Sequence, residues 1–334
     1  MTTEHDRDRP ESPTRAGGFV WQPDVSVGAW LAERIDRVWS TPGSHHVVPR
    51  GYPAAIRLFH APLASRPAGM SWAELAERDR RFEETGVLEP AEVEFEDRRV
   101  PWREVAEHRG VPWTPTISWE DILGEGDDNP ELVAFRGTSP EMLLPGNWRL
   151  SDVEEGRLDP EALAALAASI ARHDGADTAV TAAIWEGWGS LFASHPPEFM
   201  FAVRATGDEQ ADLAEGERYR REAEARYAAS ALSAEIEHGP RLELPAREYL
   251  LFRGSIGALS TEEGVLGVPW ANAASFDGPE GIALLWPDDR SWVLVTEIDA
   301  NTSVLVGEPG LLASVLAEPG VEAALLPEGT LDRV

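Results

Sequence analysis

The sequence predicts an α+β fold, in which helices pack on a mixed, mostly antiparallel sheet and a hairpin followed by a helix lies near the carboxyl terminus. One observation is that segments with helical and with strand-like spacing of apolar residues alternate irregularly along the chain, which is typical of this class. The other is the stretch 282–307, IALLWPDDRSWVLVTEIDANTSVLVG, in which short turn sequences separate apolar runs. This stretch predicts a strand, a tight turn, a second strand, another turn and a third strand.

The hairpin is the clearest of these elements. Residues 282–286 are apolar, and the proline and aspartates of 287–290 favour a turn, because proline fixes φ near the value that a type I turn needs. Residues 291–299 alternate between two faces, and both faces are apolar in the first half, which predicts a central strand covered on both sides. We expect Trp286 to pair with Ser291 across the turn.

The first half of the chain predicts several shorter elements. Ser71 and Ser118 each precede an acidic residue by three positions, a capping-box pattern that marks the start of a helix. The expected elements are a helix capped by Ser26, a strand at 54–60, a helix at 72–82, and short helices after Pro101 and Ser118.

The second half carries stronger signals. Asp159 and Pro160 begin a helix, because aspartate is a good N-cap and proline is favoured in the first turn, and Gly175 ends it. Acidic and arginine residues of 208–238 pair at i,i+4 spacing, which stabilises a solvated helix by roughly 0.2–0.5 kcal/mol per pair. The other expected elements are strands at 179–186, 248–253 and 303–306 and a closing helix with Leu311, Leu312, Val315 and Leu316.

The length of 334 residues suits one large or two medium domains. Residues 1–18 are rich in charged residues, proline and glycine and predict a disordered tail. Residues 19–150 predict a loop-rich α/β region with many tryptophans and prolines, and residues 151–334 predict an α+β domain that contains the hairpin. The alternative is that the two regions form one continuous domain.

The charge and the missing residue types exclude several kinds of function. The net charge of −30 repels phosphate backbones and anionic lipids, so we expect no nucleic-acid binding and no membrane binding. The chain has no cysteine and no lysine, which excludes thiolate catalysis, cysteine-bound zinc and Schiff-base chemistry. Since the first residues contain no apolar signal segment, we expect a cytoplasmic location.

Four carboxylates at the hairpin form a candidate metal site. In the expected register Glu297 lies opposite Glu280, with Asp277 and Asp299 nearby. Because Mg²⁺ and Ca²⁺ prefer oxygen ligands, the four residues are candidate ligands of a divalent cation, and Glu297 is also a candidate catalytic acid or base. The alternative is a solvated strand end in a very acidic protein, without any cofactor.

The sequence Trp185-Glu186-Gly187-Trp188 contains the strongest single candidate. A carboxylate between two indoles at the end of a buried strand is expected to have a raised pKa and to act as a general acid. The tryptophans, with Trp286 of the hairpin, are instead candidate ligand-binding residues that stack on a sugar or a peptide. The third possibility is that the rings are core anchors and that Glu186 pairs with an arginine.

Three histidines, His45, His46 and His60, flank the segment 47–59 and are candidate metal ligands together with a carboxylate. Adjacent histidines on an extended segment point to opposite sides, so loop or core positions are favoured over a shared metal. The chain contains no phosphate-binding glycine loop and no nucleophile-elbow pattern.

The segment LLWPDDRSWVLVTEID at 284–299, followed by SVLVG, and three pieces at 48–53, 183–189 and 244–249 resemble a family of actinobacterial cytoplasmic proteins to which no activity is assigned. Around the Trp-Pro pair that family has two aromatic residues and an asparagine, where this chain has Ala283-Leu284-Leu285. The resemblance implies a bacterial cytoplasmic origin and no particular reaction.

These observations predict a non-catalytic binding or interaction protein with an immunity-like or adaptor-like role. Its acidic surface would bind a basic protein partner, or its tryptophan-rich cleft would hold a small neutral ligand. The alternative is a carboxylate-based hydrolase, with or without a divalent metal, that uses Glu186 and Glu297.

Overall fold

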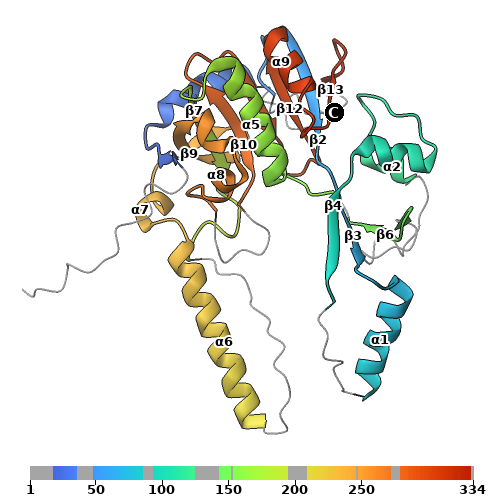
Figure 1. Cartoon of the computed structure of the whole chain (residues 1–334). Helices are drawn as coiled ribbons and strands as arrows, with labels where there is room; N and C mark the ends of the chain where they lie inside the picture. The colour runs from blue at the N-terminus through green and yellow to red at the C-terminus, as the bar shows by residue number, and fades with distance from the viewer. Residues whose placement is uncertain are drawn as a thin grey trace, which may run out of the picture.

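The computed structural model shows two antiparallel sheets with helices packed against them (Figure 1). Wherever strands pair in the described part of the chain, they run antiparallel, and helices and strands follow one another irregularly. The predicted α+β class is therefore confirmed. The structure describes residues 18–35, 48–85, 93–124, 143–151, 153–194, 209–245, 247–271 and 279–331.

The larger sheet has nine strands in the order β1-β9-β7-β10-β11-β12-β2-β13, and β8 pairs with β9. Because β1 and β2 come from the first 150 residues, both predicted regions contribute to this one sheet. Its strands are β1 (Val20–Trp21), β2 (Ala54–Phe59), β7 (Ala179–Trp185), β8 (Leu242–Leu244), β9 (Arg247–Ser255), β10 (Ile282–Pro287), β11 (Val293–Thr296), β12 (Thr302–Gly307) and β13 (Ala323–Leu325).

The predicted hairpin is present, and β11 is buried between β10 and β12 as expected for a central strand. The predicted register is wrong by two residues. Leu285 lies opposite Leu294, whereas a pairing of Trp286 with Ser291 would have placed it opposite Trp292. The cause is Pro287, which still belongs to β10, so the turn begins one residue later than expected and uses Arg290 at φ 59°.

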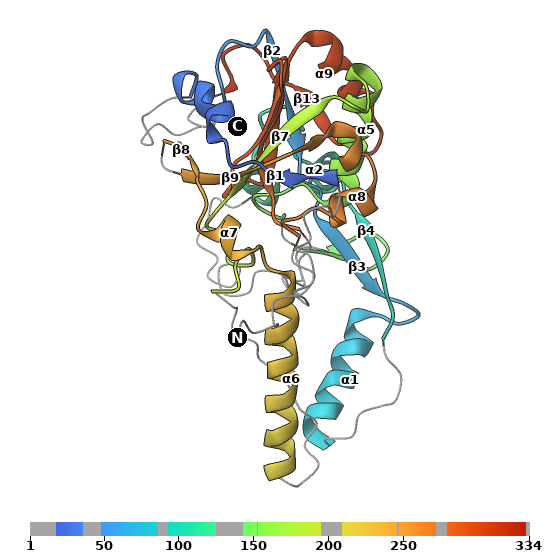
Figure 2. The same ribbon diagram turned by 90° about the vertical axis from the view of Figure 1, so that its left-hand side faces the viewer.

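Helices cover one face of the nine-stranded sheet (Figure 2). They are α5 (Pro160–Asp174), α8 (Glu262–Leu266) and α9 (Pro309–Leu316), together with the short 3₁₀ helix η5 (Ile256–Leu259). The 3₁₀ helix η2 (Val25–Glu33) packs on the opposite face. The sheet therefore has an apolar core on each side.

Local capping follows the sequence in α5 but not in η2. Asp159 accepts a hydrogen bond from the Ala162 amide at 3.0 Å, and Gly175 follows the last turn at φ 100°. Where the sequence predicts a helix capped by Ser26, the structure has the 3₁₀ helix η2. Its cap is Asp24, whose carboxylate accepts from the Ser26 amide at 3.0 Å. The cap assignment to Ser26 is therefore wrong.

A second, four-stranded sheet is not predicted by the sequence. Helices α2 (Trp102–Arg109) and α3 (Trp119–Leu123) form an apolar cluster with residues of this sheet and with Phe59 at the end of β2. Glu322, directly before β13, links the larger sheet to α2, because its carboxylate accepts from the Trp102 amide at 2.5 Å and so caps this helix. The strands are, in sheet order, β4 (Phe95–Arg99), β3 (Leu63–Pro67), β6 (Trp148–Leu150) and β5 (Leu143–Leu144).

Helices α1 (Trp72–Thr85) and α6 (Glu209–Ser230) project from the sheets in the same direction (Figure 1). The helix expected at 208–238 ends at Ser230, and a separate short helix, α7 (Ala234–Glu237), follows it. The break occurs because the amide of Leu232 donates to the carbonyl of Leu191 at 2.8 Å instead of continuing the helix. None of the helices in the described part of the chain combines the length and the apolar character needed to cross a membrane.

Candidate functional site

The three described carboxylates of the predicted metal site do not gather in one place. Glu297 and Asp299 both bind Arg247, and the distance from its Nη2 to Asp299 Oδ2 is 2.9 Å. Glu280 accepts a hydrogen bond from the Ser190 hydroxyl. Asp277 lies outside the described residues. Among the residues that the structure describes, no three histidine, aspartate or glutamate side chains form a group that could hold a metal ion.

A β-bulge in β10 explains why Glu280 and Glu297 are apart. The register between β10 and β7 shifts between Ile282 and Leu284. Ile282 packs into the core under the helices, whereas Ala283 and Leu284 both pack into the core on the other face. The bulge reverses the alternation of the residues that precede it. Pattern reading without the bulge therefore assigns Glu280 to the face opposite to its own.

Arg247 is the basic partner of Glu297 and Asp299, the two carboxylates after β11 that we call the acidic rim. Its side chain is 9% exposed, and that of Glu297 is 14% exposed. The guanidinium also lies over the Trp185 ring, 5.3 Å from its centroid. The chain itself thus supplies a positive charge to Glu297 and Asp299.

Glu186 also pairs with an arginine, which is one of the predicted possibilities. Its carboxylate accepts from Arg241 Nε at 2.7 Å, and the arginine side chain is 11% exposed. The neighbouring Glu248 carboxyl has a raised pKa, chiefly because the negative charge of Glu186 repels its charged form.

The three candidate tryptophans are packing residues in this structure. Trp185 and Trp188 meet edge to face at 5.6 Å, and each packs against a different one of the two cores that flank the sheet. Trp286 is buried and packs edge to face on Trp30 at 6.2 Å. None of the three lines a cavity that the described residues form beside the hairpin.

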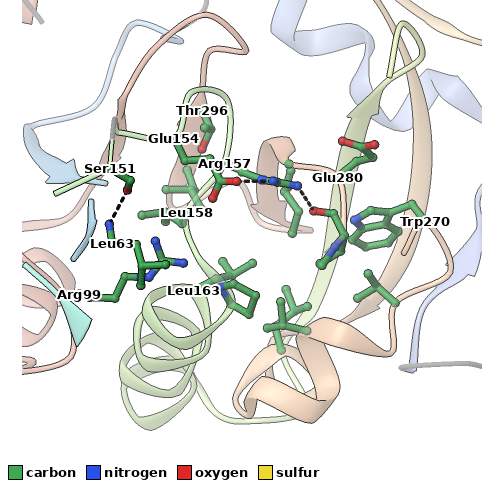
Figure 3. A pocket seen from close by; sticks show the side chains of 18 residues that line it. Leu63, Arg99, Ser151, Glu154, Arg157, Leu158, Leu163, Trp270, Glu280 and Thr296 are labelled. Carbon is green, nitrogen blue, oxygen red and sulfur yellow. Dashed lines mark hydrogen bonds and ion pairs between the residues drawn. The ribbon is translucent and has the colours of Figure 1, made fainter. Parts of the chain in front are cut away.

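That cavity measures about 400 Å³ and lies between the sheet, the start of α5, and α8 (Figure 3). Strand β11 contributes Leu294 and Thr296 to its wall, and the second sheet contributes Arg99. Much of its apolar lining comes from the loop before α5, from α5 itself, and from the segment 259–270 that contains α8: Leu158, Leu163, Leu259, Val265, Val268 and Trp270.

The charges around the cavity are balanced. The loop before α5 provides the ion pair of Glu154 and Arg157, and Arg157 Nη1 also donates to the carbonyl of Pro279 at 3.4 Å. Arg99 and Glu280 lie on opposite sides of the cavity, with Arg157 between them (Figure 3). Two arginines and two glutamates line the cavity, so it offers a positive and a negative end without net charge.

A buried hydrogen-bond chain ends at the cavity wall. His60 Nδ1 lies 2.9 Å from the carbonyl oxygen of Glu154, and Nε2 lies 2.8 Å from Ser303 Oγ. Ser303 Oγ lies 2.8 Å from Thr296 Oγ1. All three residues are at most 3% exposed. His60, Ser303 and Thr296 come from the end of β2, from β12 and from β11, so the chain crosses three neighbouring strands.

His60 is a core histidine, as the sequence favoured, while His45 and His46 lie outside the described residues. Burial lowers the pKa of His60 to about 4. The bond to the Glu154 carbonyl opposes this shift, and the positive charge of Arg57 adds to it. Both ring nitrogens are engaged in hydrogen bonds, and the low pKa keeps the ring neutral at ordinary pH.

Sequence reasoning found His60 and Glu280 but missed the loop that carries Glu154 and Arg157. The available signal was the charged run EEGR with a central glycine, directly before the well-capped α5. Ser303 and Thr296 gave no signal, because isolated hydroxyls are common in strands.

Comparison with protein-family models, with curated proteins and with solved structures found no match to this chain. The resemblance to actinobacterial proteins therefore stays a prediction.

Proposed function

We propose that the protein is a non-catalytic binding protein that holds a small molecule in the cavity between β11, α5 and α8. The observation that carries this proposal is the combination of an apolar lining with a few charged and hydroxyl groups in about 400 Å³. Small-molecule sites are concave and mostly apolar, with few polar groups, and they typically measure roughly 300–1,000 Å³.

The balanced charges support a neutral or zwitterionic ligand. A strongly anionic ligand would gain from Arg99 but would be repelled by Glu280, and a cationic ligand would meet the reverse. A small neutral ligand is one of the two partners expected from the sequence. The cavity, rather than the tryptophan pair, is the place that supports it.

The carboxylate-based hydrolase has less support. Glu186 and Glu297, the two residues assigned to it, each bind an arginine whose side chain is about a tenth exposed. Neither residue lines the cavity. Both carboxylates therefore have a local structural role as partners of Arg241 and Arg247.

A basic protein partner is a second candidate, favoured by a projecting helix and by the negative charge of the chain. Helix α6 projects from the sheets and exposes Leu213 and Tyr219, and the net charge of −30 attracts basic surfaces. We also propose a cytoplasmic location and no nucleic-acid binding, which the cysteine-free composition and the negative charge support.

The test is a thermal-shift screen with small neutral and zwitterionic compounds. A ligand at 100 times its dissociation constant adds about 2.7 kcal/mol to the free energy of unfolding, which raises the melting temperature by several degrees. Leu163→Trp fills the cavity and should abolish the shift, whereas Leu213→Trp places the same ring on the exposed face of α6 and should preserve it. A shift that survives Leu163→Trp in a folded variant would contradict the proposal.

A further inference from the structure

The donor and acceptor of each hydrogen bond in the series from His60 through Ser303 to Thr296 follow from the hydrogens that each group carries. The carbonyl oxygen of Glu154 can only accept, so His60 Nδ1 must donate to it. The imidazole is neutral in its buried site, so it carries one hydrogen only, and Nε2 must then accept. The ring is thereby held in a single tautomer.

The accepting Nε2 of His60 also fixes which way the hydroxyl hydrogens of Ser303 and Thr296 point. Ser303 has one hydroxyl hydrogen, which it donates to His60 Nε2 across 2.8 Å. The hydrogen of the bond between Ser303 and Thr296 must therefore come from Thr296. Thr296, the member of the chain that lines the cavity, has then used its only hydroxyl hydrogen and presents lone pairs alone.

We propose that Thr296 is a fixed hydrogen-bond acceptor in the cavity wall, and that the cavity selects a neutral or zwitterionic molecule with an N–H or O–H donor at this point. This inference rests on the proposed function, since it requires the cavity to bind a small molecule. A carbonyl, carboxylate or phosphate oxygen placed against Thr296 would meet another acceptor, and the penalty is large because the site is shielded from water.

The other groups limit the rest of the ligand. An apolar body fits the lining around Leu163 and Trp270, while Arg99 and Glu280 on opposite sides can hold an acidic and a basic substituent. The ligand class is therefore a compact apolar molecule with an amide, amine or hydroxyl donor, such as an aromatic amide or an apolar amino-acid derivative.

The tautomer can be tested without a ligand. Protein labelled with ¹⁵N at histidine is examined by long-range ¹H–¹⁵N correlation at pH 7, and His60→Gln identifies the signals of this ring. The expected result is a protonated Nδ1 and an unprotonated Nε2. A protonated Nε2 would reverse the direction of both hydroxyl bonds and would overturn the inference.

The selectivity is tested with matched fragments that differ in one donor: benzamide against methyl benzoate, and phenol against anisole, with benzoate as the acceptor-only anion. Binding is measured by ligand-observed NMR. We expect the donor member of each pair to bind about fivefold more tightly, since one net hydrogen bond contributes about 1 kcal/mol. Thr296→Val should remove this preference, and Thr296→Ser, which retains the hydroxyl, should preserve it.

The outcomes separate the two proposals. If none of the fragments binds, and none of the wider set of compounds shifts the melting temperature, the proposed function fails and the inference fails with it. If fragments bind in the cavity, as judged by the loss of binding in Leu163→Trp, but donor and acceptor members bind equally, only the role of Thr296 is overturned. A preference that persists in Thr296→Val also overturns it.

Discussion

Gly156 and Gly281 lie backbone against backbone. A β carbon at Gly281 would overlap the carbonyl oxygen of Gly156, and one at Gly156 would lie 2.6 Å from the carbonyl oxygen of Ile298. Gly156 also has a φ of 77°, in the left-handed region that favours glycine. The two glycines let the loop before α5 press against the start of β10, and this brings Glu154 and Arg157 to the cavity.

Replacing Gly281 by alanine should therefore destabilise the protein. The atom in the way is a backbone oxygen, which cannot move aside as a side chain can, so the free energy of unfolding should fall by about 1–3 kcal/mol. Urea denaturation measures this change. Gly189→Ala is the control, because its β carbon meets nothing within 4 Å, and it should change stability by less than about 0.5 kcal/mol. Equal effects of the two variants would contradict the argument.

The buried His60 should make stability depend on pH. In the unfolded chain the ring gains a proton below about pH 6.5, but in the folded protein it does so only below about pH 4. The unfolded state binds more protons between these values, so stability falls as the pH falls from 6.5 to 4, by roughly 3 kcal/mol in total.

Denaturation of the wild type and of His60→Gln between pH 7 and pH 4 measures this contribution. Because the many carboxylates titrate in both proteins, the difference between the two curves isolates the histidine. The stability advantage of the wild type should narrow steadily toward pH 4. A difference that is constant with pH would show that the ring is not held neutral.

Arg57 should be a strong structural link between β2 and the region of helices α2 and α3. Its buried side chain donates to the carbonyl of Ile117 at 2.7 Å and lies over the Phe59 and Trp102 rings. Arg57→Met should lower the free energy of unfolding by about 1–3 kcal/mol, because it leaves a buried carbonyl without its donor.

The matched control for this substitution is Arg172→Met. Arg172 is 62% exposed and pairs with Glu318 at the surface, and exposed ion pairs contribute only about 0–1 kcal/mol. Chemical denaturation of both variants gives the comparison. If the Arg172 variant loses as much stability as the Arg57 variant, burial is not what gives Arg57 its importance.

The acidic rim gives a fourth prediction. Because Arg247 binds both Glu297 and Asp299, Mg²⁺ or Ca²⁺ at millimolar concentration should change the melting temperature of the wild type and of Glu297→Gln equally. Thermal denaturation with and without each ion tests this. A rise in melting temperature in the wild type that disappears in Glu297→Gln would instead support the four-carboxylate metal site.

The sequence predicts the elements whose signals are local. The capping boxes of Ser71 and Ser118, the cap and proline of α5, and the alternation of β11 all correspond to elements of the structure. Strand β4 of the second sheet was missed because its sequence, FEDRR, is almost entirely exposed and charged and lacks the apolar alternation by which strands are recognised.

The site depends on features that a sequence pattern does not contain. The bulge in β10 separates Glu280 from Glu297, and the pattern of the hairpin gives no sign of it. Likewise, Thr296 and Ser303 become a functional pair only because β11 and β12 place them opposite each other, with His60 arriving from the end of a strand far away in the chain.

The position of β2 has a consequence for how the chain is made. Its pairing partners are β12 and β13, in which Val304 and Ala324 lie on either side of Arg57. These pairs can form only after β12 and β13, near the end of the chain, have left the ribosome. Until then the apolar strand AAIRLF has both edges open and is a target for chaperones or for misassociation with other nascent chains. Deletion of β13 leaves one edge of β2 permanently unpaired. It should therefore lower the yield of native protein by more than its effect on the stability of the folded protein alone predicts.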